Sequence, residues 1–138
     1  MSSTGLELSK SSPAADLVRR FCVEWPGLAP SDIAAFFAPD FVYQHMSVAR
    51  PLVGPQMIAG AIEVFRARFE QIESEVLAIA EAAGTVLCER EDRFWLPGGR
   101  IVGFRAMASM VTSEGKISFW DDYYDLATLS LQVDLTEA

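Results

Sequence analysis

The sequence predicts a single α+β domain in which N-terminal helices pack on one face of a mostly antiparallel sheet. Apolar residues recur at helical spacing in the first half of the chain, and from about residue 73 the apolar period changes to two. Short turn signals that contain glycine separate the later segments, which favours antiparallel strands joined by tight turns. The 138 residues are enough for one domain with a buried core and too few for two.

Three helices are predicted in the first half. The first begins at Ser12-Pro13, where serine can cap the helix and proline suits its first turn, and it ends at Pro26-Gly27. A short second helix begins near Pro30 and is broken at Pro39-Asp40, and a third runs from about Pro55 to Ile72. The expected buried faces are Leu17, Val18, Phe21, Cys22 and Trp25 in the first helix, Ile33, Phe36 and Phe37 in the second, and Ile58, Ile62, Phe65 and Phe69 in the third.

Five strands are predicted. The first runs from Phe41 to Met46, and alternation puts Tyr43 and His45 on one of its faces. A loop that contains Gly54-Pro55 follows this strand. The other four strands are expected at about 73–81, 85–96, 100–112 and 116–125, and residues 1–12 and 131–138 are expected to be tails of a domain that spans 13–130.

The composition excludes several classes of partner. A formal net charge of −8 repels phosphate backbones and anionic membrane surfaces, so neither nucleic acid nor a membrane surface is expected to bind. Hydrophobic residues make up 51% of the chain and the mean hydropathy is +0.21, but no run approaches the roughly 18 apolar residues of a membrane span. The surplus apolar surface is therefore expected to line a pocket, a dimer interface or both.

The sequence also predicts a protein without cofactors. No phosphate-binding loop, G-x-G-x-x-G fingerprint, G-x-S-x-G elbow or C-x-x-C pair occurs, and there is one histidine, so neither nucleotide nor metal is expected. Cys22 and Cys88 lie far apart in apolar runs and are predicted to be reduced and buried, with a single disulfide as the alternative. The N-terminus lacks the basic and apolar regions of a signal peptide, and a cytoplasmic location is expected.

Two later strands carry charged residues on faces that are otherwise apolar. In the segment 85–94, alternation puts Arg90 and Asp92 on the face that points into the core. In the last strand, Asp122 shares a face with the aromatic residues Trp120 and Tyr124. Buried charges must be paired, and such pairs are enriched at functional sites. The alternatives are a structural ion pair at the rim of the sheet and, for the last strand, burial of the opposite face.

Four segments carry a family resemblance. FCVEW, FFAPDFVYQHM, ERED and KISFWDDYYDL occur in the order, and near the spacing, of limonene-1,2-epoxide hydrolases, and the chain resembles that family over roughly residues 14–130. The most specific motifs are E-R-x-D, here Glu89–Asp92, and W-x-D-Y-x-D, here Trp120–Asp125. The resemblance implies an NTF2-like (SnoaL-like) cone, an α+β fold whose curved sheet encloses an apolar pocket.

The resemblance also implies a site. The residues that match the family's Asp-Arg-Asp triad are Asp92, Arg90 and Asp122. Tyr43 matches the family's water-holding tyrosine, whereas His45 stands where the family has asparagine. The implied activity is hydrolysis of an apolar epoxide, derived from a terpene, a lipid or a sterol-like molecule, to a vicinal diol. Asp92 would be the acid and Asp122 the base, while Tyr43 and His45 would hold the attacking water.

Two other functions stay open. One is an NTF2-like domain that binds a hydrophobic small molecule without catalysis, which the histidine at position 45 would favour. The other is an enzyme like ketosteroid isomerases or polyketide cyclases, but that chemistry needs no pair of aspartates bridged by arginine. A homodimer is also expected, because the outward residues Leu87, Phe119 and Tyr123 would leave an apolar patch on a monomer.

Overall fold

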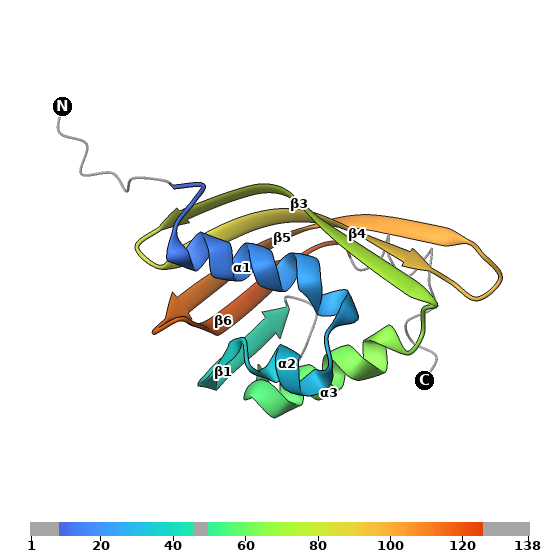
Figure 1. The fold of residues 1–138 in the computed structure, drawn as a ribbon, viewed down its shortest axis with the longest axis horizontal. Helices are drawn as coiled ribbons and strands as arrows, with labels where there is room; N and C mark the ends of the chain where they lie inside the picture. The colour runs from blue at the N-terminus through green and yellow to red at the C-terminus, as the bar shows by residue number, and fades with distance from the viewer. Residues whose placement is uncertain (1–8, 46–49, 126–138) are drawn as a thin grey trace.

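The structure is a computed structural model that describes residues 9–45 and 50–125. In chain order the elements are α1 (Pro13–Glu24), the 3₁₀ turn η1 (Trp25–Gly27), α2 (Pro30–Ala34), β1 (Phe37–His45), β2 (Leu52–Val53), α3 (Pro55–Arg66), β3 (Gln71–Ala82), β4 (Thr85–Trp95), β5 (Ile101–Ser113) and β6 (Lys116–Tyr123). Figure 1 shows a curved sheet with the helices on its concave side.

The described strands form one sheet in the order β2-β1-β6-β5-β4-β3. β1 runs parallel to β6, and every other pairing is antiparallel. The sheet curves around the helices and does not close into a barrel (Figure 1). The α+β fold predicted from the sequence, with helices on one face of a mostly antiparallel sheet, is confirmed.

The first helix forms as its sequence predicts. The Ser12 hydroxyl accepts a hydrogen bond from the Ala15 amide at 3.0 Å, which satisfies one of the free donors at the helix start. The apolar face of α1 packs against the inner side of β3 and β4, so that Phe21 and Cys22 are each 1% exposed. This packing places one wall of the cavity described below.

Two predicted helix boundaries are wrong. α3 ends at Arg66 rather than Ile72, because the chain turns into the sheet: the Glu70 amide donates to the Trp95 carbonyl at 2.8 Å, and β3 begins directly afterwards. Ile72 therefore lies in a strand. The helical spacing of the apolar residues extended the predicted helix too far, because the segment from Gln71 pairs with β4 and forms a strand.

The segment around Pro39-Asp40 also differs from prediction. β1 begins at Phe37, which was expected in the second helix, and it runs through the proline that was expected to break that helix. Proline is tolerated there because the register with β6 shifts between Phe37 and Val42. The short strand β2 was expected to be loop, since two residues are too few to show a period. The predicted strand end at Met46 lies outside the described residues.

The four later strands agree with prediction to within two residues at each end. The turn between β3 and β4 has positive φ at both central residues, Ala83 (54°) and Gly84 (83°). Two positive φ angles match the twist of a two-residue hairpin turn, and glycine adopts the second one without a steric penalty. The predicted meander is therefore built as tight antiparallel hairpins.

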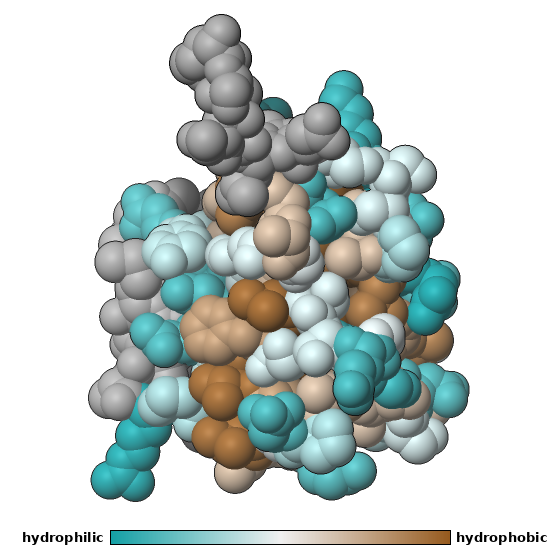
Figure 2. Space-filling view, turned by 90° about the vertical axis from the view of Figure 1, so that its left-hand side faces the viewer, coloured by the Kyte–Doolittle hydropathy of each residue, from teal (hydrophilic) through white to brown (hydrophobic). Residues whose placement is uncertain are grey.

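The face of the domain seen in Figure 2 carries both polar and apolar side chains. Figure 2 looks at the end of the molecule where the β3–β4 and β5–β6 turns lie, and apolar side chains reach the surface there in small groups between polar ones. Within the described part of the chain, no helix is long and apolar enough to cross a membrane.

Arg66 ties the end of α3 to the loop after α1. One of its terminal nitrogens, Nη1, donates to the carbonyl oxygens of Trp25 at 2.9 Å and Leu28 at 2.7 Å, with a longer contact to Pro26 at 3.3 Å. The side chain is only 13% exposed, and its other terminal nitrogen pairs with Glu63 at 3.0 Å. Because Trp25 lines the cavity, this clamp fixes one wall of the cavity as well as the packing of two helices.

Substitution of Arg66 tests this clamp. We expect Arg66→Met to lower the free energy of unfolding by roughly 2–3 kcal/mol, because part-buried carbonyls lose their donors. The measurement is urea denaturation. Arg19→Met is the control, since Arg19 makes a 3.6 Å ion pair with Asp16 and a 3.4 Å hydrogen bond to the Lys10 carbonyl, both on the surface, and its loss should change stability by less than about 1 kcal/mol. Equal urea midpoints for the two variants would contradict the clamp.

Candidate active site

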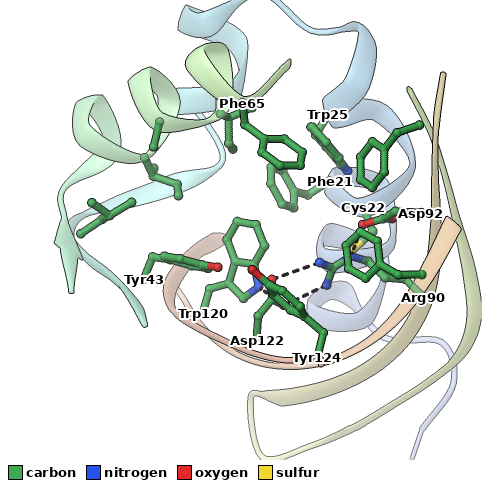
Figure 3. A pocket seen from close by; sticks show the side chains of 16 residues that line it. Phe21, Cys22, Trp25, Tyr43, Phe65, Arg90, Asp92, Trp120, Asp122 and Tyr124 are labelled. Atoms are coloured by element: carbon green, nitrogen blue, oxygen red, sulfur yellow. Dashed lines mark hydrogen bonds and ion pairs between the residues drawn. The ribbon is translucent and has the colours of Figure 1, made fainter. Parts of the chain in front are cut away.

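A cavity of about 180 Å³ lies between the concave face of the sheet and the helices (Figure 3). Its walls are largely aromatic and aliphatic, and the charged groups come from β4 and β6. The apolar lining consists of Phe21, Trp25, Leu52, Ile58, Ala61, Ile62, Phe65, Phe94, Phe104 and Trp120, and the polar lining of Tyr43, Arg90, Asp92, Asp122 and Tyr124, with Cys22 beside them.

β4 delivers two charged residues to this cavity. Its burial alternates strictly, and the inner positions include Arg90 at 6% and Asp92 at 2% exposure. The inward orientation predicted from alternation is therefore confirmed. Both residues leave water for an apolar surrounding, which is costly unless each charge is paired.

β6 delivers the third charged residue through an irregularity. The register with β5 shifts between Val111 and Thr112, so Ile117 and Trp120 both face inward although they are three residues apart. Asp122 then follows on the inner face at 3% exposure. The sequence left open which face of this strand is buried. Both alternatives are partly right, because Ile117 is buried before the bulge and Trp120 and Asp122 are buried after it.

Arg90 bridges the two carboxyl groups. Its two terminal nitrogens donate to the two oxygens of Asp122 at 2.9 and 3.0 Å, and its Nε donates to Oδ2 of Asp92 at 3.1 Å (Figure 3). Burial by itself lowers the pKa of Arg90, but Asp122 and Asp92 outweigh this and hold its pKa well above the ordinary value. Arg90 is thus a permanent cation between two carboxyl groups.

The space that Arg90 crosses is kept open by small residues on β5. Ala106 pairs with Arg90, and Ala108 pairs with Asp122, in the strand that separates β4 from β6. Both alanines are buried, at 4% and 0% exposure. A larger side chain at either position would occupy the path of the guanidinium group.

Two further donors were not anticipated from the sequence. The indole Nε1 of Trp120 donates to Asp122 Oδ1 at 2.7 Å, and the hydroxyl of Ser74 on β3 donates to Asp92 Oδ1 at 2.7 Å. Trp120 could have been found from its position two residues before Asp122 on the same face. Ser74 gives no such signal, because its neighbour on β4 depends on the register of the hairpin.

Tyr43 reaches the same site from β1. Figure 3 shows it projecting toward Trp120, with the two rings edge to face and their centroids 4.7 Å apart. Burial raises the pKa of the Tyr43 phenol far above its ordinary value, and the negative charge of Asp122 raises it further. The phenol therefore stays neutral and can donate a hydrogen bond.

His45 is in register with Asp122 along the parallel pairing of β1 and β6. Its side chain lies outside the described residues, so its role in the site stays a prediction from the sequence.

Of the two cysteines, Cys22 lines the cavity and Cys88 does not. Both are free thiols and buried, in agreement with the prediction of reduced cysteines. The neighbouring Cys88 thiol and burial raise the pKa of Cys22, whereas the neighbouring Cys22 thiol lowers the pKa of Cys88. Within the described ranges, no three His, Cys, Asp or Glu side chains gather to hold a metal ion.

The fold and the cavity define a class before any activity is considered. A helix-covered, strongly curved sheet with a pocket in its concave face is the architecture of NTF2-like domains, and solved structures agree. A solved structure from Jannaschia sp. CCS1, described as a SnoaL-like polyketide cyclase, matches with a TM-score of 0.77 at 14% identity. The match covers 89% of this chain and 92% of that one. A hypothetical protein of ketosteroid isomerase-like fold from Catenulispora acidiphila DSM 44928, in complex with trimethylamine, matches with a TM-score of 0.76 at 21% identity, covering 87% and 93%.

The family is shown by the sequence itself. Residues 29–134 match the family model of the limonene-1,2-epoxide hydrolase catalytic domain, and the chain belongs to that family. An LEH-like epoxide hydrolase from M. tuberculosis is similar in structure, with a TM-score of 0.73 at 20% identity over 91% of this chain and 99% of that one. At these identities the structural matches establish the fold only.

Removal of the central cation tests the electrostatics of the site. We expect Arg90→Met to lower the free energy of unfolding by about 3–5 kcal/mol, because two buried carboxyl groups lose their counter-ion. Arg105→Met is the matched control: this side chain is 67% exposed and lies 3.7 Å from Glu91, so about 1 kcal/mol or less is expected. Urea denaturation measures both, and similar losses would show that Arg90 is not the cation that makes this burial tolerable.

Proposed function

We propose that the protein is a cofactor-independent epoxide hydrolase that adds water to an apolar epoxide and forms a vicinal diol, acting as one domain over residues 13–130. The observation that carries the proposal is the pair of buried carboxyl groups bridged by one guanidinium in an otherwise apolar cavity. Membership of the limonene-1,2-epoxide hydrolase family supports it.

Charge balance divides the work between the two aspartates. With both carboxyls ionised, Arg90, Asp92 and Asp122 would carry a net negative charge in an apolar site. In the proposed mechanism the pair holds one proton between its two carboxyl groups, which leaves one carboxylic acid and one carboxylate. An epoxide opening needs both: an acid for the oxygen and a base for the water.

The roles follow from this division. Asp122 takes a proton from water as the water oxygen attacks an epoxide carbon. The carbon–oxygen bond of the ring breaks, and Asp92 gives its proton to the leaving oxygen, so a diol forms without a covalent enzyme ester. Transfer of one proton from Asp122 back to Asp92 restores the starting state. Tyr43 would orient the water, together with His45, whose part remains a prediction from the sequence.

The cavity supports a compact substrate. Its volume of about 180 Å³ is below the roughly 300–1,000 Å³ of pockets that enclose drug-sized ligands. Among the substrates considered from the sequence, a terpene-sized epoxide or a short lipid epoxide fits this space. A sterol-sized molecule would extend beyond the enclosed part.

A second candidate is a non-catalytic NTF2-like binder of a hydrophobic small molecule. The observation that favours it is the histidine at position 45, where the family has asparagine. Isomerase or cyclase chemistry is less well supported, because moving one proton beside a carbonyl would not require Arg90 to hold two buried carboxyls.

Turnover in oxygen-18 water decides between these functions. We expect the wild type to form labelled diol from a panel of small apolar epoxides. Asp92→Asn and Asp122→Asn should each lower kcat/KM by roughly 10²–10⁴-fold, since each removes a proton donor or acceptor from the transition state. Diol formation by folded Asp122→Asn at the wild-type rate would contradict the mechanism, and binding of the panel without any turnover would establish the binder.

We also propose that the protein forms a homodimer through the outer face of the sheet and acts in the cytoplasm. Leu87 and Tyr123, which were expected on that face, are 50% and 44% exposed, whereas the third expected residue, Phe119, is only partly exposed. Met107, which is 45% exposed and pairs directly with Tyr123, adds to the patch. Covering this surface should bury about 1,200 Å² or more in total. Light scattering at micromolar concentration should give twice 15.2 kDa, and a monomer mass would overturn the proposal.

A further inference from the structure

Ser74 contacts the carboxyl group of Asp92 from the edge strand of the sheet. The two residues are direct partners in the pairing of β3 with β4, and both point to the concave side. The Ser74 hydroxyl lies 2.7 Å from Oδ1 of Asp92. The flanking residues Glu73 and Glu75 are exposed and pair with Arg93, so Ser74 is the position at which this stretch of β3 turns a polar group toward the site.

The two oxygens of Asp92 therefore have different neighbours. Oδ2 accepts from the Nε of Arg90, and a guanidinium group can only donate. A proton carried by Asp92 is better placed on Oδ1, because Oδ2 then remains the stronger acceptor for Arg90. Oδ1 is the oxygen that Ser74 contacts.

We propose that Ser74 is a positioning residue for the acid in this site: it orients the Asp92 carboxyl and stabilises the carboxylate that remains once the proton has gone. This inference rests on the proposed hydrolysis, in which Asp92 is the acid. Ser74 does not line the epoxide cavity and acts through Asp92 alone.

A hydroxyl group suits this task because it both donates and accepts. Beside a neutral Asp92 it makes an ordinary hydrogen bond with Oδ1. As Oδ1 loses its proton, the hydroxyl donates to a growing negative charge, and hydrogen bonds to charged groups are roughly twice as strong as neutral ones. The contact is thus stronger in the transition state than in the resting state, which is the condition for a contribution to kcat rather than to KM.

The test uses two substitutions of nearly equal shape. Ser74→Thr keeps the hydroxyl, and Ser74→Val replaces it with a methyl group; both residues suit a strand. We expect Ser74→Val to lower kcat about 10- to 100-fold with KM within about twofold of the wild type. Ser74→Thr should stay within about threefold of the wild-type kcat. Ser118→Val is the control, because its hydroxyl serves a backbone carbonyl on β5 and does not touch the site.

A second measurement does not require turnover. In protein labelled with ¹³C at the aspartate carboxyl, the Asp92 signal is the one lost in Asp92→Asn. Ser74→Val should shift this signal, whereas Ser74→Thr and Ser118→Val should leave it in place. If the wild type hydrolyses epoxides and Ser74→Val matches Ser74→Thr in kcat and in the carboxyl signal, the role of Ser74 is overturned while the function stands.

If the wild type hydrolyses no epoxide, the proposed function fails instead, and the carboxyl signal alone then shows whether Ser74 governs Asp92. An unchanged signal in Ser74→Val overturns the inference in that case too.

Discussion

The arrangement of the site depends on one guanidinium group held between two carboxyl groups. Arg90 gives its two terminal nitrogens to Asp122 and its Nε to Asp92, so a single planar group sets the distance and orientation of both acids. Lysine could not do this, because an ammonium group is a point charge without a fixed fork. Trp120 donates to Asp122 and Ser74 donates to Asp92, so each oxygen of these two carboxyl groups has a donor. The cluster is tolerable in an apolar cavity for that reason.

The fold supplies the conditions for this contact. Arg90 and Asp122 lie on strands separated by β5, and the guanidinium reaches across because Ala106 and Ala108 stand between them. The curvature of the sheet brings the inner faces of β4 and β6 toward each other and toward the helices (Figure 1). The aromatic walls make the surroundings of the charges apolar, which strengthens each charge interaction. The small residues Ala106 and Ala108 leave room for the guanidinium group, and the large aromatic residues surround it with apolar walls. Both therefore serve the same buried ion cluster.

The sequence predicted the features that depend on short-range periodicity. Alternation along one strand was enough to predict that Arg90 and Asp92 point inward, and the capping signal at Ser12 predicted the start of the first helix. Features that depend on irregular register were missed. Unbroken pairing from the Ala83-Gly84 turn would put Glu75 opposite Asp92, and a register shift between Val76 and Ala78 puts Ser74 there instead. A one-residue shift of this kind leaves no mark in the composition of the strand.

The cost of the buried cluster argues for its use. Replacing a buried ion pair by apolar residues of similar volume is often neutral or stabilising, so a core of this size would not need Arg90, Asp92 and Asp122 for stability. The same three residues are buried but line the cavity between the helices and the sheet. Their charges are thus kept where a small molecule can meet them, and the donors around them hold the carboxyls in fixed positions before it arrives. In the proposed reaction, a site that is oriented in advance would spend less free energy on rearrangement, and this advantage would offset its cost to the fold.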